Sequence, residues 1–249
     1  MLPTTTPTAS PAHPEDALRT ELCEIGRRVW QLGFVAANDG NFSCRLADGT
    51  FLCTPTGVSK GFMQPDDMVV VDAQGSHVRG HRRVTSEFRM HLAIYRHRPD
   101  VAAVVHAHPP HATAFAMRRQ PLPRGVLPEI EVFLGEIPLV PYARFGTEAM
   151  GDVLRPCLGQ HVAWLLASHG AVTAGSTPLE AYLRMESVDF YCRILSISAS
   201  LGGWRALAPH EVEELWNLRR QLGYPDVTQG RSPEQWIAGD SSPSTPPTA

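Results

Sequence analysis

Short valine-rich runs alternate irregularly with segments of helical periodicity along this 249-residue sequence. The runs Met68 to Val71 and Val101 to Val105 are typical of buried β-strands, and residues 86–98 between them repeat apolar side chains at helical spacing. Because strands and helices do not alternate regularly, the pattern disfavours a doubly wound repeat. It predicts an α/β protein with a mixed sheet and helices on both of its faces.

Other segments have clear local patterns as well. Further helices are predicted over residues 15–32 and 178–200, the second preceded by the capping-box pattern Thr177-Pro178-Leu179-Glu180. Further strands are predicted over residues 42–45, 51–53 and 162–167, with Asp48-Gly49 as a hairpin turn. The sequence shows no repeat and no linker between residues 15 and 239, so a single domain is predicted there.

The two ends of the chain are rich in Pro, Ser and Thr. Residues 1–14 and 240–249 are poor in apolar side chains, and we expect both to be disordered tails. The N-terminal segment has neither the charged nor the apolar part of a secretory signal. Five scattered cysteines, an odd number without a CxxC motif, favour reduced thiols and a cytoplasmic protein.

Charge and hydropathy exclude several kinds of partner. The net charge is −3 and Lys and Arg form no extended cluster, so a nucleic-acid interface is not expected. No stretch approaches the roughly 18 apolar residues that a membrane span requires. The eleven histidines are the one unusual feature of the composition, and they direct attention to metal chemistry.

The strongest chemical motif is His106-Ala107-His108, which follows the predicted strand at 101–105 and precedes Pro109-Pro110. Side chains alternate along a strand, so the two imidazoles point to the same side and can chelate one metal ion. His169 follows another predicted strand in the same way. Three neutral imidazoles leave the fourth position of a zinc ion open, as catalytic sites require. Alternatively, histidines at strand ends only pack or cap the strand.

Three polar segments allow two interpretations each. In Thr85-Ser86-Glu87, Ser86 can be the N-cap of the following helix, with Glu87 as its first residue. Alternatively, the hydroxyl groups and the helix N-terminus bind phosphate while Glu87 acts as a general base. The segments 38–41 and 54–57 are ordinary turns or nests of backbone N–H groups for an anion. Lys60, which follows the second of them, is interpreted as a phosphate-binding or a surface charge.

In their order along the chain, these motifs resemble the class II aldolase/adducin family, and within it the fuculose-phosphate aldolases. The resemblance extends from about Leu18 to Ser200. It rests on six segments: Asp39-Gly40-Asn41-Phe42-Ser43, Thr54-Pro55-Thr56-Gly57-Val58, Thr85-Ser86-Glu87, Val104-Val105-His106-Ala107-His108, Tyr142-Ala143-Arg144-Phe145-Gly146-Thr147 and His169-Gly170. It implies a three-layer α/β/α sandwich around a mixed, mainly antiparallel central sheet.

The resemblance also implies roles for particular residues. It makes His106, His108 and His169 the ligands of a Zn²⁺ ion, with Glu87 near the metal and acting as the acid or base. It makes Tyr142 a proton donor that reaches the zinc of a neighbouring chain in a homotetramer, although a loop tyrosine can equally be a surface or packing residue. The residues implied to bind the substrate phosphate are Gly40, Asn41, Thr56, Gly57, Thr85 and Ser86. Where family aldolases often have Thr or Ser before the Gly-Asn pair, this chain has Asp39.

The implied reaction is zinc-dependent cleavage or formation of a carbon–carbon bond in a ketose 1-phosphate, with dihydroxyacetone phosphate and an aldehyde as products. Family epimerases of pentulose phosphates tend to carry Asp where Glu87 stands, so glutamate favours the aldolase. Decarboxylases of phosphorylated oxo-acids and a dehydratase of methylthioribulose phosphate share most of these motifs and remain alternatives. An adducin-like structural module that binds no metal is disfavoured, because all three histidines are present.

Overall fold

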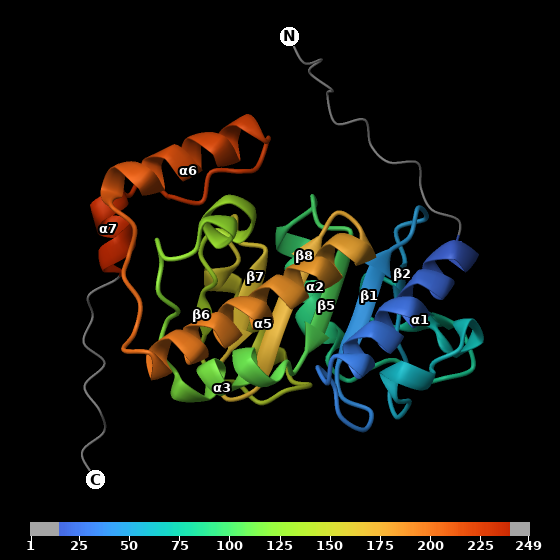
Figure 1. Ribbon diagram of the computed structural model, residues 1–249. Coiled ribbons are helices and arrows are strands. Elements are labelled where there is room, and N and C mark those ends of the chain that lie inside the picture. The colour runs from blue at the N-terminus through green and yellow to red at the C-terminus, as the bar shows by residue number, and fades with distance from the viewer. Residues whose placement is uncertain (1–14, 240–249) are drawn as a thin grey trace.

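The computed structural model describes residues 15–239 as an eight-stranded sheet with helices on both faces (Figure 1). The strand order is β4-β3-β2-β1-β5-β8-β7-β6, and every neighbouring pair is antiparallel except β6 and β7. The predicted three-layer sandwich with a mixed, mainly antiparallel sheet is therefore confirmed. The tails predicted at 1–14 and 240–249 lie outside the described residues.

The bounds of the strands match the predicted runs to within two residues wherever a run was recognised. The strands are β1 (Asn41–Arg45), β2 (Phe51–Cys53), β3 (Val69–Val71), β4 (His77–Arg79), β5 (Ala103–Ala107), β6 (Leu139–Val140), β7 (Ala163–Leu166) and β8 (Gly170–Gly175). The strand predicted over 101–105 is β5, which begins two residues later and continues through the first histidine of the HxH motif. His106 is consequently fixed by the sheet itself.

The helices form the two outer layers and a small cap. They are α1 (Glu15–Gln31), α2 (Phe88–His97), α3 (Pro110–Arg118), α4 (Glu148–Leu154), α5 (Pro178–Ser200), α6 (Pro209–Gln221) and α7 (Pro233–Ala238). One apolar core joins α1, α3 and α5 to one face of the sheet, and a second core joins α2 and α4 to the other face. Along β5, Val105 belongs to the first core and Val104 to the second. His106 therefore points to the α2 face.

The cap of helix α5 differs in part from the predicted capping box. Thr177 is the N-cap, and its side chain accepts a hydrogen bond from the backbone N–H of Glu180 at 3.1 Å. The carboxylate of Glu180, however, accepts from the N–H of Ser176 at 2.6 Å, one residue before the cap. Pro178 is the first helical residue, as predicted, because its missing N–H is not needed there.

Strand β8 was not predicted, although it is an interior strand of the sheet, between β5 and β7. Its sequence, Gly-Ala-Val-Thr-Ala-Gly, contains few of the residues that favour strands. Pairing on both sides and complete burial stabilise it in place of local propensity. The elements β4, β6, α3, α4, α6 and α7 were not predicted either, since their sequences are short or lack a clean apolar period.

Helices α6 and α7 form a separate apolar cluster beyond the β6 end of the sheet (Figure 1). The rings of Trp216 and Trp236 meet edge to face in it, with centroids 5.6 Å apart. The Trp236 indole N–H donates to the carboxylate of Glu131 at 2.8 Å. This bond anchors the cluster to the segment that precedes strand β6. Within residues 15–239, none of the helices combines the length and apolar character needed to cross a membrane.

Candidate active site

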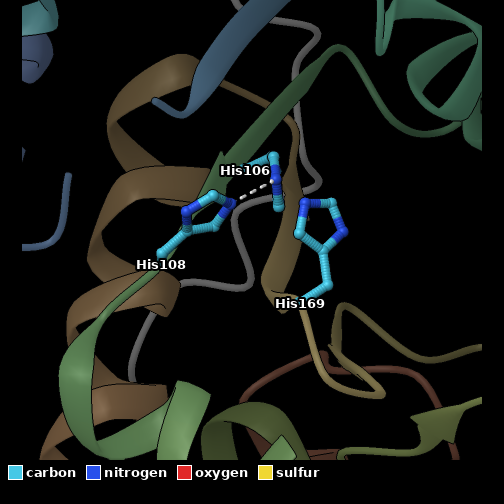
Figure 2. A group of neighbouring side chains, drawn as sticks. All are labelled: His106, His108 and His169. Atoms are coloured by element: carbon cyan, nitrogen blue, oxygen red, sulfur yellow. Dashed lines mark hydrogen bonds between the residues drawn. The ribbon is translucent and has the colours of Figure 1, made fainter. Parts of the chain in front are cut away.

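Three histidine rings converge at one edge of the sheet (Figure 2). His106 lies in β5, His108 follows that strand, and His169 lies in the turn between β7 and β8. Because β8 pairs with both β5 and β7, the end of β5 lies beside this turn: Ala107 pairs with Ala171, two residues after His169. The strand order thus brings together residues that are about sixty positions apart in sequence.

The spacing of the three rings suits a single metal ion. One nitrogen from each ring can be chosen so that all three lie within 4.8 Å of one another. The Nε2 atoms of His106 and His108 are 3.2 Å apart, close to the roughly 3.3 Å that separates two ligands of a tetrahedral zinc ion. Neutral imidazoles at this spacing form the donor set that zinc prefers, so the residues present fit the ion.

The environment of His106 keeps its ring neutral and oriented. Its Nδ1 lies 2.8 Å from the carbonyl oxygen of Ala171, so Nδ1 carries the proton and Nε2 presents its lone pair to the site. Burial, followed by the neighbouring His169 and His108 rings, holds the pKa of His106 well below its usual range. Burial also lowers the pKa of His169. Both rings are therefore in the form that binds metal.

The turn that carries His169 has an unusual backbone. Ser168 adopts a φ of 57°, in the left-handed region that residues other than glycine seldom occupy. Its N–H donates to the carbonyl of Ala116 at 3.1 Å, and its hydroxyl accepts from the guanidinium of Arg119 at 3.0 Å. Helix α3 and the residue after it therefore hold the turn in the conformation that presents His169 to the other two rings.

The carboxylate of Glu87 faces two of these rings. Its oxygens lie 3.3 Å from Nε2 of His169 and 3.5 Å from Nε2 of His106. The side-chain amide of Asn41 donates to the same carboxylate at 2.7 Å. Glu87 can therefore reach both a metal ion held by the histidines and a substrate bound to that ion.

The start of α2 differs from the prediction. The helix begins at Phe88, so Glu87 is its N-cap and makes no side-chain capping bond, whereas Ser86 lies one residue earlier. The prediction of Ser86 as the N-cap is wrong. The hydroxyl of Thr85 accepts from the Glu87 N–H at 3.3 Å, and its carbonyl accepts from Phe88 N–H at 3.3 Å. This turn stabilises the helix start and leaves the Glu87 side chain free for the site.

A pocket of about 280 Å³ opens beside the histidines. It brings together the residues predicted to bind phosphate, except Gly57, with Glu87 and two of the three histidines. Its lining consists of Asn38, Asp39, Gly40, Asn41, Pro55, Thr56, Lys60, Thr85, Ser86, Glu87, His108, Phe145 and His169. This lining offers both hydroxyl groups and imidazoles to a small phosphorylated molecule.

Gly40 lets the loop at 38–41 approach strand β5 closely. Its φ is 73°, and a Cβ at this position would lie 2.7 Å from the Val35 side chain and 3.0 Å from the carbonyl oxygen of His106. A larger residue would push the loop away from the strand that carries His106. The neighbouring Asp39 directs its carboxylate toward His108, with 3.6 Å between Oδ2 and Nδ1. Asp39 therefore faces the histidine end of the pocket.

Lys60 is not a surface charge. It is the only lysine of the chain, which carries 21 arginines among its 22 basic residues, and its exposed fraction is 1%. Its ammonium donates to the carbonyl of Asn38 at 3.0 Å, in the segment 38–41, and to that of Val58 at 2.8 Å, directly after the segment 54–57. Burial lowers the pKa of Lys60 to about 8. The lining of the pocket therefore includes a buried side chain that is positively charged at neutral pH.

Tyr142 does not line the pocket of its own chain. Its side chain is 58% exposed, and the guanidinium of Arg119 lies 5.7 Å from the centre of its ring. Phe145, three residues later, does line the pocket, with its ring centroid 5.9 Å from that of His169. Sequence reasoning assigned no role to Phe145, because an aromatic residue in a loop carries no chemical pattern of its own.

His91 was also missed. It is completely buried in α2, one turn after Glu87, and its Nε2 lies 2.6 Å from the Oδ1 atom of Asn41. A polar residue four positions after Glu87, on the face that also carries Phe88, Leu92 and Tyr95, is the pattern that could have identified it.

Comparison with known proteins places the site in a family context. Residues 20–196 match the model of the class II aldolase and adducin N-terminal domain. An L-fuculose phosphate aldolase of Methanococcus vannielii is 36% identical over 180 residues, which cover 72% of this chain and 96% of the relative.

Two further relatives carry different activities in their names. A 3-oxo-tetronate 4-phosphate decarboxylase of Escherichia coli O6:H1 is 33% identical over 187 residues, covering 74% of this chain and 88% of the relative. A 5-methylthioribulose-1-phosphate/5-deoxyribulose-1-phosphate aldolase of Rhodospirillum rubrum is 35% identical over 222 residues, covering 87% and 96%. All three relatives are named for phosphorylated substrates.

Proposed function

The chain belongs to the class II aldolase and adducin family, and on that premise we propose that it is a zinc-dependent lyase of a ketose 1-phosphate. In this proposal it cleaves or forms the bond between C3 and C4, with dihydroxyacetone phosphate and an aldehyde as products. The observation that carries the proposal is the position of the Glu87 carboxylate, 3.3 and 3.5 Å from two rings of the histidine group. A pocket of about 280 Å³ borders the same carboxylate.

The histidines would hold the metal, and the other residues of the pocket would handle the substrate. Zinc bound by His106, His108 and His169 would stabilise the negative charge that develops next to the carbonyl carbon. Glu87 would transfer the proton at the carbon that carries this charge, which is the neighbour of the carbonyl carbon. Its hydrogen bond from Asn41 keeps the carboxylate aimed at the histidine rings while the proton moves.

The phosphate would bind at the opposite end of the pocket. The loops around Gly40 and Gly57 supply backbone N–H groups, and Thr56, Thr85 and Ser86 supply hydroxyls. The second amide hydrogen of Asn41 remains available to the substrate, since one hydrogen binds Glu87. The Lys60 ammonium beneath these loops would favour an anion by its charge.

The role of Tyr142 depends on assembly. Tyr142 would donate a proton to the aldehyde-side oxygen in the site of a neighbouring subunit, in a cytoplasmic homotetramer. Support comes from its position: it is exposed and outside the lining of its own pocket. A tyrosine so placed can act only if a second chain brings a pocket to it.

A panel of ketose 1-phosphates tests the reaction, with released dihydroxyacetone phosphate as the product measured. Ketose 5-phosphates serve as controls, because cleavage between C3 and C4 leaves their phosphate on the aldehyde. The zinc content of each preparation should be about one ion per chain in the unchanged protein. His106→Ala should lose both zinc and turnover, whereas His97→Ala, an exposed residue at the end of α2, should lose neither. Full zinc without release of dihydroxyacetone phosphate from any member of the panel would refute the aldolase.

Decarboxylation of a phosphorylated oxo-acid is the second candidate. It is favoured by the 33% identity to the 3-oxo-tetronate 4-phosphate decarboxylase over 187 residues. Both reactions leave negative charge next to a carbonyl, so the same metal site would serve either one. Release of CO₂ from a phosphorylated 3-oxo-acid, without dihydroxyacetone phosphate from any ketose phosphate, would select the decarboxylase.

A further inference from the structure

A line of hydrogen-bonded side chains runs from the pocket into the core between the sheet and α2. The amide of Asn41 donates to Glu87 at 2.7 Å, and its oxygen lies 2.6 Å from Nε2 of His91. The other ring nitrogen, Nδ1 of His91, lies 2.7 Å from the hydroxyl of Ser43. The Tyr95 hydroxyl lies 2.8 Å from the Ser43 hydroxyl and 3.0 Å from the Ser43 carbonyl.

The four groups behind Glu87 are removed from water. Asn41, Ser43, His91 and Tyr95 are each at most 3% exposed. Burial lowers the pKa of His91 to about 3, so its ring is neutral at physiological pH. A neutral imidazole has one N–H donor and one acceptor nitrogen, and each of its nitrogens here has only one partner.

The donor and acceptor groups available fix which side chain donates and which accepts in the bonds from Glu87 to Ser43. An ionised Glu87 can only accept, so Asn41 must present its NH₂ group to the carboxylate and its oxygen to His91. Nε2 of His91 must then carry the proton, which leaves Nδ1 to accept from the Ser43 hydroxyl. The Tyr95 hydroxyl donates to the backbone carbonyl of Ser43 at 3.0 Å. Each bond in the line therefore fixes the orientation of the next.

We propose that His91, held as its Nε2–H tautomer between the Asn41 oxygen and the Ser43 hydroxyl, is a positioning residue that orients the Asn41 amide and thereby aims Glu87 at the metal site. Without the donor at Nε2, the amide could rotate and turn its oxygen toward the carboxylate, which would repel it. The proposal depends on the proposed function only where turnover is measured; the tautomer and the orientation are properties of the chain itself.

The tautomer can be measured directly in the unmodified, metal-free protein. Nitrogen NMR of protein labelled with ¹⁵N-histidine distinguishes protonated from unprotonated ring nitrogens, and loss of one signal pair in His91→Gln assigns this residue. We expect a proton on Nε2 and none on Nδ1, unchanged between pH 6 and pH 9. In Ser43→Ala the preference should weaken. A proton on Nδ1 in the unmodified protein would overturn the proposal, whatever reaction the enzyme catalyses.

Kinetics distinguish positioning from a general loss of stability. His91→Leu should lower kcat by about tenfold to a hundredfold, because small displacements of a catalytic group have large effects, while KM changes by less than about twofold. His91→Gln, whose amide nitrogen takes the place of Nε2, should restore most of kcat. His97→Leu on the same helix is the matched control and should retain the kcat of the unchanged protein. Equal losses in the Leu and Gln variants would contradict positioning.

A double-mutant cycle tests the route through Asn41. If His91 acts by orienting this amide, Asn41→Ala should remove the effect, and adding His91→Leu to it should lower kcat by no more than about twofold. Independent, multiplicative losses in the double variant would overturn the proposal. If the chain catalyses no ketose-phosphate cleavage at all, the tautomer measurement still decides the structural part.

Discussion

Gly170 lies directly against the ring of His108. A Cβ at position 170 would stand 2.7 Å from Cδ2 of that ring and 2.6 Å from the carbonyl oxygen of Ala107. Real side chains essentially never approach so closely, and the oxygen belongs to strand β5, which cannot move freely. The glycine after His169 therefore allows the two histidine-bearing segments to pack against each other.

Gly170→Ala should accordingly weaken zinc binding by about tenfold or more, because the added methyl group must displace His108 from the other rings. The measurement is a competition titration of zinc against a chromophoric chelator, together with kcat. Gly151→Ala in helix α4 is the matched control, since its Cβ would meet only the Ala93 methyl group at 3.3 Å. Unchanged zinc affinity in Gly170→Ala would contradict the role assigned to this contact.

Glu87→Gln should lower kcat by about a hundredfold or more while zinc is retained. Glutamine keeps the size of the side chain, and its amide oxygen can still accept from Asn41, but it cannot take up a proton. Metal analysis and steady-state kinetics on the same preparation measure both effects. Glu148→Gln, at a position where the carboxylate is 84% exposed, should leave kcat unchanged. Near-normal turnover in Glu87→Gln would exclude Glu87 as the acid or base.

The charge of Lys60 predicts a pH dependence of phosphate binding. Burial lowers its pKa to about 8, with partial opposition from the charges of Asp39 and Glu87. The ammonium is thus present below pH 8 and is lost as the pH rises through that value. Affinity for inorganic phosphate should fall by about tenfold between pH 7.5 and pH 9.5, a range in which phosphate itself remains mostly a dianion.

Lys60→Met removes the charge and should bind phosphate more weakly, with no step near pH 8. Calorimetric titration at a series of pH values measures both curves. Arg27→Met, which removes an exposed charge paired with Glu24 on α1, controls for the change in net charge. The same decline with pH in Lys60→Met as in the unchanged protein would show that another group titrates.

Tyr142→Phe and His106→Ala should each be inactive alone and should recover activity when mixed and reassembled. If each site takes its histidines from one chain and its tyrosine from a neighbour, about a quarter of the sites in a random mixture contain both intact residues. Native mass spectrometry verifies that subunits have exchanged. Absence of recovery after proven exchange would place both residues in one chain or remove Tyr142 from the reaction.

Local patterns were sufficient for much of the scaffold. The apolar period of α1, the proline and threonine at the start of α5 and the valine run of β3 each specify their element with nearby residues alone. Strand β8 could not be found in this way, because Gly-Ala-Val-Thr-Ala-Gly becomes a strand only between β5 and β7. The start of α2 was also misplaced, since Thr85 rather than Ser86 makes the local hydrogen bonds.

For the site, the sequence by itself identified the candidate groups: two histidines on the same face at one strand end, a third after another strand, and a carboxylate before a helix. It contained no information on distance. Only the tertiary structure placed His169 beside His106, because that proximity depends on the order of strands. It also placed Lys60 under the pocket and Asn41 between Glu87 and His91. Contacts between residues fifty positions apart arise from how whole elements pack, and no local pattern encodes that packing.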